Sequence, residues 1–551
     1  MKKPKILKLL VNVGIAILAI IYFFVDAINL NPFYFEGALF WCLLITAYIV
    51  SWAVFKFGEL MPKLTQSENG RISFTSTKSI PKQVKIVLIV PWAFLGIMVV
   101  LSSALINWGA YRDQLGELEI KTFSSDMQAM DINQIPIVDE ELAKKLADKK
   151  LGERPSLGSQ VYLGDPTIQM VDGKLIWAVP LHHSGFFKWI TNLSGTPGYI
   201  KVSATNLNDV EYIDGYNIKY HPNSFLFHDL QRYLRATKAP FIGLTDFSFE
   251  LDDAGQPYWV VSTYKNKRGF SLPESTGVII VNASTGESIQ YDKENVPEWV
   301  DRVQPENFII EQIYNKGEYV HGIFNFSDKD KYKPSRGHAI VYNNKRCYLF
   351  TGLTSVGQDE SAIGFMMVDM VTKQPILYQM NGATEYSSQK SAMGKVQHLE
   401  YVASDPIILN INDIPTYFMT LKDREGLVKQ YAFVSVESYS NVGVGETIKT
   451  ALLDYQKIMK NDGFNTNEFA KPEDEKKITS KVLRIASEFN GSETVYKILL
   501  EGHEDKIFIA IAALSDDLAL TNSGDMLSIS YYETGSPIMN VSAFDNREFT
   551  K

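Results

Sequence analysis

The sequence predicts a three-helix membrane anchor, a large α+β region of repeated modules and a small all-β C-terminal domain. Three observations indicate this organisation. Residues 1–108 contain the long apolar runs of the 551-residue chain, whereas residues 109–551 have the mixed composition of a soluble protein. Turn residues and alternating apolar residues recur through the second part, which is typical of antiparallel strands. A short phrase also repeats there about every 80 residues, which indicates a series of similar modules.

Three stretches in residues 1–108 are long enough to cross the apolar core of a bilayer, which is about 30 Å thick. We expect helices at about residues 9–26, 38–56 and 86–108, because the apolar runs within these ranges lack charged residues. Lysines precede the first run, as in a signal peptide, but no small-residue cleavage site follows it. The first run is therefore expected to remain as a membrane helix.

Basic residues predict the orientation of this anchor. The N-terminal tail has four lysines, residues 26–37 have no Lys or Arg, and residues 56–85 have six. Basic loops stay in the cytoplasm, so the tail and the second loop are expected there. The third helix then delivers residues 109–551 to the outside. We expect a multi-pass protein of the cell membrane with a cytoplasmic N-terminus and an extracytoplasmic region.

Charge and cysteine usage exclude some classes of function. Residues 1–108 carry ten Lys/Arg and four Asp/Glu, a net charge of +6, so a whole-chain charge of −9 leaves −15 for the remainder. An acidic soluble region repels phosphate backbones, and nucleic acid is not an expected partner. Cys42 lies in an apolar run and Cys347 in the soluble part, so we expect no disulfide between them.

The repeated phrase has a glycine, three mostly apolar residues and a valine. It occurs at Gly198–Val202, Gly277–Val281 and Gly364–Val368. A helical segment precedes each copy, at residues 139–150, 224–236 and 305–315. The expected α+β modules span residues 109–215, 216–300 and 301–383, with a divergent fourth module at 384–460.

These modules resemble the PepSY family, small domains named for peptidase propeptides and found also in membrane-anchored surface proteins. The resemblance lies in a helix followed by antiparallel strands that close on Val281-Asn-Ala-Ser-Thr-Gly-Glu287; the other two copies lack the Thr-Gly-Glu ending. It covers residues 137–440. It implies roles in inhibition or binding and brings no catalytic residues.

The end of the chain differs from the modules in composition. Residues 461–475 are polar and charged, as in a linker. Five short strand-like segments follow within residues 476–551, near 481–485, 494–500, 507–513, 526–532 and 539–544. Short strands at this spacing favour a small barrel of OB or SH3 type.

Motifs of catalysis are not evident in the sequence, which contains no Gly-rich phosphate loop, GxSxG elbow or HExxH pair. His182 and His183 are adjacent on an expected strand and so point to opposite faces, which makes them a poor chelate. These imidazoles, with those of His221 and His228, are expected at the surface or half-buried. Two Ser-x-x-Lys matches, Ser262–Lys265 and Ser387–Lys390, are attributed to chance. We assign no catalytic, cofactor-binding or metal-binding residue.

Aromatic side chains are the candidate contacts for a partner or ligand. Phe186, Phe187 and Trp189 are expected in a loop between strands, and Tyr258 and Trp259 in a strand. Aromatic residues also favour strands for packing reasons alone, so core packing is the competing interpretation. A third interpretation is that an exposed aromatic loop enters the headgroup layer of the membrane.

The function expected from these patterns is that of a membrane-tethered extracytoplasmic binding or scaffold protein, not an enzyme. It would engage a protein or peptide partner or belong to a larger envelope assembly. One alternative is an envelope hydrolase or peptidase-like enzyme with a site assembled from several modules. Another is a transmembrane sensor, which the short cytoplasmic parts disfavour. The lipid bilayer is an expected partner, no cofactor is expected, and the ligand and oligomeric state are left open.

Overall fold

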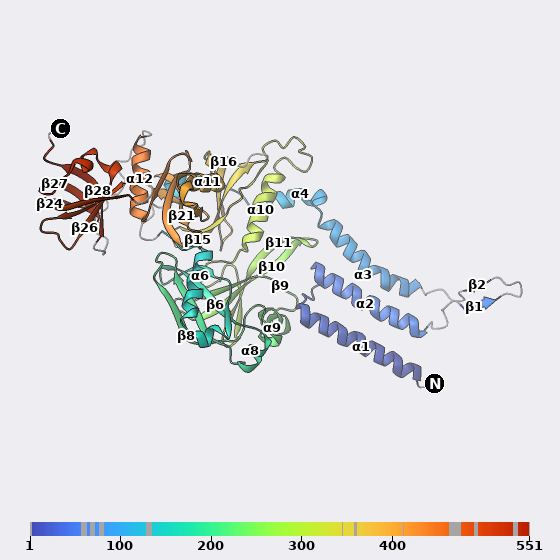
Figure 1. The fold of residues 1–551 in the computed structure, drawn as a ribbon. Helices are drawn as coiled ribbons and strands as arrows, with labels where there is room; N and C mark the ends of the chain where they lie inside the picture. Colours follow the sequence, from blue (N-terminus) through green and yellow to red (C-terminus); the bar gives the residue numbers. More distant parts are fainter. Residues whose placement is uncertain are drawn as a thin grey trace. The chain divides into compact units, whose positions relative to one another are not determined.

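A computed structural model divides the chain into two compact units, residues 1–462 and 463–551. The structure describes residues 3–56, 63–66, 72–75, 82–127, 135–343, 345–356, 361–411, 413–461, 475–489, 494–532 and 538–549. Figure 1 gives the element labels used below.

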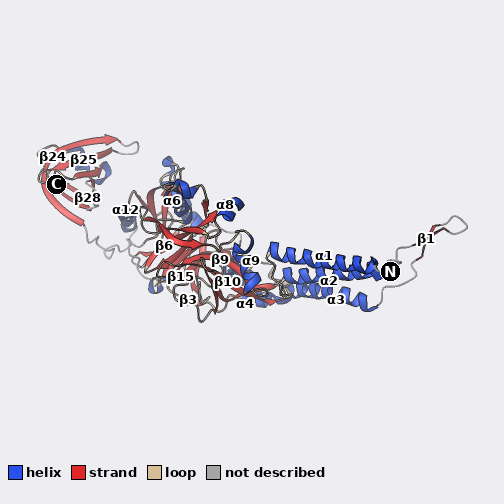
Figure 2. Cartoon of the chain, turned by 90° about the horizontal axis from the view of Figure 1, so that it is seen from below, coloured by secondary structure: helices blue, strands red, loops and turns tan. Residues whose placement is uncertain are grey.

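The first unit begins with three helices that are long and apolar enough to cross a membrane, as the sequence predicts. They are α1 (Lys3–Asp26), α2 (Phe35–Lys56) and α3 (Lys82–Leu101). The helices lie side by side in Figures 1 and 2. Polar groups join them, since the Ser51 hydroxyl donates to Asn12 at 2.8 Å and Trp92 Nε1 donates to Thr46 at 3.0 Å. Between α2 and α3 lies the small hairpin of β1 (Lys63–Gln66) and β2 (Ile72–Thr75).

The third helix is shorter than predicted. It ends at Leu101, and a separate helix α4 (Ala104–Asp113) follows. Ser103 separates them because its hydroxyl accepts from the N–H of Leu105 and caps α4. The predicted span to residue 108 therefore includes the first turn of a second helix.

Four mainly antiparallel sheets follow, each with helices at its side. The first sheet lies with α6 (Glu140–Gly152), α7 (Pro155–Gly158) and α8 (Phe186–Thr191) and contains β4 (Val161–Leu163), β5 (Thr167–Val171), β6 (Lys174–His183), β7 (Thr196–Ser203) and β8 (Val210–Ile218). The second lies with η2 (Leu226–His228) and α9 (Leu230–Thr237) and contains β9 (Gly243–Leu251), β10 (Pro257–Arg268), β11 (Ser271–Asn282) and β12 (Ser288–Asp292).

The third and fourth sheets are built in a similar way. The third lies with α5 (Phe123–Asp126) and α10 (Glu306–Glu318) and contains β13 (Tyr332–Pro334), β14 (Ala339–Asn343), β15 (Arg346–Ser355), β16 (Ser361–Asp369), β17 (Pro375–Tyr378), β18 (Gly382–Ala383) and β3 (Glu119–Lys121). The fourth lies with α11 (Glu385–Lys395), η3 (Gln397–Leu399) and α12 (Ile448–Asn461) and contains β19 (Val402–Ala403), β20 (Ile407–Ile411), β21 (Ile414–Lys422), β22 (Val428–Ser435) and β23 (Val442–Gly445).

One hydrogen-bond pattern recurs in all four sheets. Val202, Val281 and Val368 are buried in β7, β11 and β16, and each strand pairs with a strand on either side. Two residues after each of these valines, the backbone N–H donates to a carbonyl at the start of the preceding long strand. These bonds are Ala204 to Leu175, Ala283 to Pro257, Met370 to Cys347 and, in the fourth sheet, Val436 to Pro415, at 3.0–3.2 Å.

The carbonyl of the same residue holds the segment that enters each sheet. The carbonyl of Ala204 accepts from the N–H groups of Ile137 and Val138, and that of Ala283 accepts from Lys219 and Tyr220. In the third and fourth sheets, the carbonyl of Met370 accepts from Val303 and Gln304, and that of Val436 accepts from Ala383. A helix begins shortly after each of these donors. The four segments thus share one way of closing a sheet, although their sequences differ.

Two boundaries differ from the sequence expectation. Residues 119–121, expected in the first module, form β3 in the third sheet, where they pair in parallel with β17. The helix expected at 224–236 is divided into η2 and α9. Asp229 lies between them, and its side chain accepts from the N–H of Arg232 at 2.8 Å, which caps α9.

The second sheet is fastened to the ends of the membrane helices. Arg235 of α9 is only 3% exposed and donates to the carbonyls of Ala27 at 3.0 Å, Ala239 at 2.8 Å and Ile242. At the tip of the β10–β11 hairpin, the N–H of Phe270 donates to the Ser102 hydroxyl at 2.6 Å. Backbone and side-chain bonds therefore join this sheet to both α1 and α3.

The second unit is a five-stranded ring. Its strands are β24 (Glu475–Phe489), β25 (Thr494–Leu500), β26 (Ile507–Ile511), β27 (Met526–Tyr532) and β28 (Ile538–Asn546), and they close in the order β24-β25-β26-β28-β27. The first half of β24 pairs with β27 and the second half with β25. Val482, Ile498, Phe508 and Ile529 lie in its apolar core. Of the expected linker, residues 462–474 lie outside the described residues.

Candidate functional site

A cleft in the first unit is lined by residues that lie in or next to all four sheets. One part has a volume of about 660 Å³ and lies between the start of α6 and the fourth sheet. The other part, of about 520 Å³, extends between strands β5, β9, β14 and β20. The two parts share four lining residues, which are Asp139, Glu140, Ser404 and Asp405.

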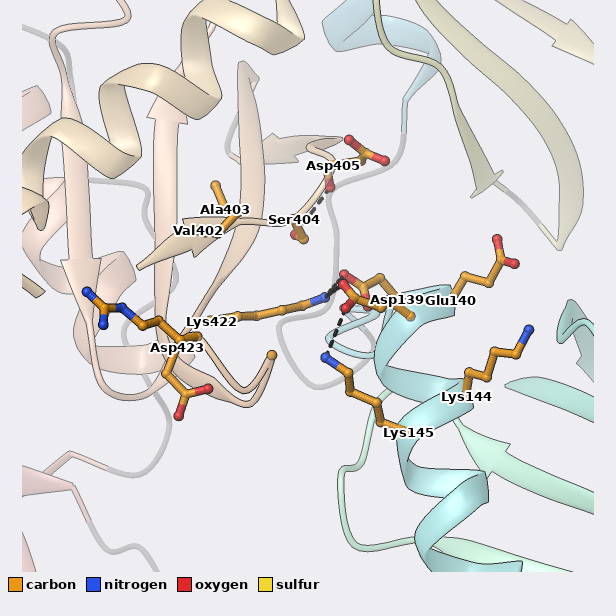
Figure 3. Close-up of a pocket in the computed structure, with 13 residues that line it drawn as sticks. Asp139, Glu140, Lys144, Lys145, Val402, Ala403, Ser404, Asp405, Lys422 and Asp423 are labelled. Atoms are coloured by element: carbon orange, nitrogen blue, oxygen red, sulfur yellow. Dashed lines mark hydrogen bonds and ion pairs between the residues drawn. The ribbon is translucent and has the colours of Figure 1, made fainter. Parts of the chain in front are cut away.

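The first part of the cleft is held by an ion-pair network (Figure 3). Lys422 of β21 is mostly buried and pairs with Asp139, and its Nζ also lies 3.6 Å from Glu141. Lys145 pairs with Glu141 at 2.9 Å and donates to the carbonyl of Glu425 at 3.1 Å. These contacts bind α6 of the first module to the β21–β22 turn of the fourth.

Asp139 has two roles in this network. Its Oδ1 accepts from the N–H of Leu142 at 2.9 Å and caps α6, while its Oδ2 faces Lys422. A negative charge at a helix N-terminus is favourable because it meets the positive end of the helix dipole. The position of Asp139 is therefore fixed by both the helix and the facing strand.

In the second part of the cleft, an arginine contacts a glutamate, which in turn contacts a histidine. Arg302 donates to Glu306 at 2.8 Å and to the carbonyl of Ile168 at 2.8 Å. The other oxygen of Glu306 lies 3.7 Å from His338 Nε2. Burial would raise the pKa of Glu306, but the bond to His338 and the charge of Arg302 lower it below its ordinary value. The bond to Glu306 raises the pKa of His338, so this pair tends to be charged.

Three further carboxylates at this cleft, Glu140, Asp246 and Asp405, have no cationic partner within 4 Å among the described residues. Asp246 is the extra residue of a β-bulge in β9 and has a φ of 50°. Burial raises the pKa of Asp246, and burial together with Asp165 raises that of Glu140. The Asp405 side chain accepts from Gln389 at 3.2 Å.

Apolar side chains form the remaining walls of the second part. They come from different sheets and comprise Val138, Ile168, Trp177, Phe247, Ile340, Ile407, Phe418 and Met419. Trp177 is fixed by a bond from Nε1 to the carbonyl of Val138 at 2.7 Å. A concave site with apolar walls and a few positioned polar groups is typical of a binding site.

Buried acids lie behind this cleft, between the second and third sheets. Asp301 accepts from the N–H of Met170 at 2.8 Å and from the Tyr342 hydroxyl at 2.9 Å. Glu250 is 1% exposed, and neither carboxyl oxygen has a hydrogen-bond partner within the described residues. Burial, with the nearby Asp301, raises the pKa of Glu250 to about 8.

The histidines are more buried than the sequence indicates. His182, His183 and His221 are all buried, and the ring centroid of His221 lies 4.4 Å from that of His182 and 6.2 Å from that of His183. The expectation of surface or half-buried imidazoles is wrong for these three, because the rings of Tyr162 and Trp259 pack on His182 and the three imidazoles lie close to one another. Burial lowers the pKa of His182 to about 4 and that of His221 well below its ordinary value. Among the described residues, no group of three His, Cys, Asp or Glu side chains could hold a metal ion.

The candidate aromatic contacts do not gather into one site. The expected loop at residues 186–189 is instead the short helix α8, in which Phe186 and Phe187 are exposed and Trp189 is buried. Trp189 donates to His228 at 2.9 Å. Trp259 is buried in β10 and donates to the carbonyl of Tyr220 at 2.7 Å, while Tyr258 packs against Trp299. Burial removes Trp189 and Trp259 from direct contact with a partner.

The remaining candidates have structural roles. Ser262 and Lys265 lie in β10, whereas Ser387 and Lys390 lie in α11, where Ser387 bonds to the capping residue Thr384. Cys347 is buried in β15. The sequence did not point to the cleft residues, because they come from separate loops, strand edges and helix starts. The one local signal that could have found one of them is the Asp at position 139, a residue type favoured at helix N-caps, directly before Glu140 and Glu141.

Comparison with known protein families and with curated proteins gives no match. Among solved structures, a levansucrase mutant from B. megaterium is similar at 9% sequence identity, covering 75% of this chain and 96% of that chain with a TM-score of 0.18. A TM-score of this size carries no argument about fold or function.

Proposed function

We propose that this protein is a membrane-tethered extracytoplasmic binding protein that holds a basic segment of a protein or peptide in its four-module cleft. The observation that carries the proposal is the composition of the cleft. Apolar walls are accompanied by carboxylates from every module, namely Glu140, Asp165, Asp246, Glu306 and Asp405. Carboxylates attract Lys and Arg side chains, and the apolar walls accept their aliphatic stems.

The rigidity of the cleft supports binding rather than a passive gap. The ion pairs of Lys422 hold one side, and Arg302 holds the other by bonds to Glu306 and Ile168. A preorganised site loses less conformational entropy when a ligand binds. The net charge of −15 outside the anchor would also attract basic partners from a distance.

Peptide binding tests the proposal directly. The full chain in phosphatidylcholine nanodiscs is mixed with fluorescent eight-residue peptides that alternate Lys and Thr, or Glu and Thr, and empty nanodiscs report binding to lipid. We expect the lysine peptide to bind and the glutamate peptide not to bind. The double variant Asp246→Asn, Asp405→Asn should weaken binding by at least about tenfold, because two charge-assisted hydrogen bonds are lost.

A matched control removes two charges elsewhere. Asp292→Asn with Glu294→Gln changes exposed carboxylates near the end of β12 and should leave the affinity unchanged. Equal binding of both peptides, or an equal loss of affinity in both double variants, would contradict binding in the cleft.

The Glu306–His338 pair favours one alternative, a hydrolase with a site assembled from several modules. A carboxylate–imidazole pair beside an apolar wall can act in general acid–base catalysis. If cleavage of the lysine peptide accompanied its binding and Glu306→Gln abolished cleavage alone, the alternative would replace the binding proposal.

The proposal includes the orientation and the module types. We place the N-terminus in the cytoplasm and residues 109–551 outside, from the distribution of basic residues. The four modules are assigned as PepSY-like. The C-terminal ring is assigned to the OB type, because its first three strands run in order, the fifth precedes the fourth, and the third and fifth are parallel.

Cysteine labelling tests the orientation. Asp330→Cys, at an exposed position, should react with a membrane-impermeant thiol reagent in intact cells. Ser67→Cys, in the second loop, should react only after permeabilisation. The reverse pattern would overturn the orientation, and the parent chain controls for its two buried cysteines.

A further inference from the structure

Exposed aromatic and aliphatic side chains surround α8 and η2 at one side of the first unit. Phe187 is 80% exposed, and Phe186, Ile190, Leu226 and Phe227 are also exposed. The rings are in contact, with centroids 5.8 Å apart for Phe186 and Phe187. We call this surface the α8 patch. Exposed apolar surface of this kind is expected only where something covers it.

The α8 patch continues onto a membrane helix. The ring of Phe227 lies 4.9 Å from that of Phe24, which is in the last turn of α1. In Figures 1 and 2, α9 lies beside the end of α1. The patch is therefore at the level where α1 leaves its apolar run.

A second exposed pair lies in a loop that contacts α4. Phe324 is 78% exposed and Phe326 is 86% exposed, in the turns that follow α10. This loop begins at Tyr319, whose ring lies 6.0 Å from that of Tyr111 in α4. The loop therefore lies beside α4, the helix that follows α3.

A third exposed ring, that of Phe241, lies near the connection between α1 and α2. Phe241 is exposed, and its carbonyl accepts from Asn31 at 3.0 Å. Asn31 lies in the short connection between α1 and α2, at the same end of the helix bundle. Exposed phenylalanines thus occur beside α1, beside the α1–α2 connection and beside α4.

We propose that the α8 patch and the Phe324–Phe326 loop insert into the headgroup and upper acyl region of the bilayer that α1–α3 span. The proposal rests on these three helices being membrane-spanning. The occupant is the lipid bilayer because the patch is continuous with Phe24, a residue of a membrane helix. Aromatic and aliphatic side chains enter this interface favourably, to a depth of about 5–10 Å.

This contact would fix the orientation of the first unit relative to the membrane. The anchor holds the second sheet through Arg235 and Phe270. Contacts on two sides of the bundle would stop the unit from tilting about that junction. The cleft would then be presented at a constant height above the lipid surface.

Spin labelling of the full chain in phosphatidylcholine nanodiscs tests the proposal. Phe187→Cys and Phe326→Cys replace exposed rings, and Tyr439→Cys is the matched control because Tyr439 is an exposed aromatic residue in the fourth module. Cys42 and Cys347 are buried, and the labelled parent measures their background. Collisions with oxygen, which concentrates in lipid, are compared with collisions with a water-soluble nickel chelate.

We expect the ratio of oxygen to nickel collisions to be several-fold higher at positions 187 and 326 than at 439. Equal ratios at all three positions would overturn the proposal by placing both patches in water. Low collision rates with both reagents at 187 or 326 would also overturn it, because a second copy of the chain would then cover the patch. A lipid ratio at only one of the two positions would exclude contact on both sides of the bundle.

Discussion

Replacement of Glu250 by glutamine tests the electrostatics of the buried acids. Glu250 lies in β9 between the second and third sheets and is 1% exposed. Burial, and secondarily the charge of Asp301, raises its pKa from 4.5 to about 8. Glutamine has nearly the same shape but cannot ionise. The substitution therefore removes the cost of a buried charge and leaves the packing largely unchanged.

The sign follows from the direction of the pKa shift. Below pH 4.5 the carboxyl is protonated in both the folded and the unfolded state, and the protein keeps its full stability. As the pH rises, the unfolded state loses its proton first, so stability falls by about 1.4 kcal/mol per pH unit until the pH reaches the folded pKa. The free energy of unfolding of Glu250→Gln, relative to that of the parent, should therefore be roughly 3 kcal/mol higher at pH 8 than at pH 5.5.

Thermal unfolding of the full chain in detergent at pH 5.5 and pH 8 measures this gain. The pH-independent cost of burying an amide cancels when the two values are subtracted. Glu287→Gln, at an exposed position in the turn between β11 and β12, is the control and should show no such difference. If the stability difference between Glu250→Gln and the parent were the same at both pH values, the carboxyl would not be desolvated and the reasoning would fail.

Three other predictions concern the histidines, the anchor and the C-terminal ring. Because burial lowers the pKa of His182 to about 4, its stabilising contribution is present above pH 6.5 and is lost as the pH falls toward 4. The stability of His182→Gln relative to the parent, measured by thermal unfolding, should therefore be roughly 2 kcal/mol higher at pH 5 than at pH 7.5. Arg235→Met leaves three carbonyls without their donor and should cost about 3 kcal/mol, seen as faster amide exchange in residues 27–34, whereas Arg268→Met at the exposed hairpin should not. Residues 463–551 alone should give one cooperative thermal transition by circular dichroism, since they contain their own core, and a fragment without a transition would contradict this.

The anchor and the β-rich character were predictable because each depends on local composition. Long apolar runs determine the three helices, and alternation with turn residues indicates strands. The third helix was predicted too long because Ser102 and Ser103 are compatible with a helix by composition. The break comes from the hydrogen bond by which Ser103 caps α4, and hydropathy does not indicate such a bond.

The cleft and the buried histidines depend on long-range contacts that a linear sequence does not indicate. Lys422 meets Asp139 across the first and fourth modules, and Asp246 faces the cleft only because a bulge reorients it. His182 and His183 are adjacent in β6, and both are buried because other parts of the chain, His221 among them, pack close to their rings. Residue type indicates polarity, but exposure follows from which element packs on top.

Glu250 and His182 together limit the pH range of highest stability. Glu250 costs stability as the pH rises from 4.5 to about 8, whereas His182 costs stability as the pH falls from 6.5 to about 4. Between pH 4.5 and 6.5 the two slopes are equal and opposite, so their sum is flat; outside that range stability falls on either side. Asp301 and Asp229 also have raised pKa values, as Glu250 does, and His183 and His221 have lowered ones, as His182 does. A parent chain whose unfolding temperature rises continuously from pH 6.5 to pH 8 would contradict this balance, because no group in the set gains stability in that interval.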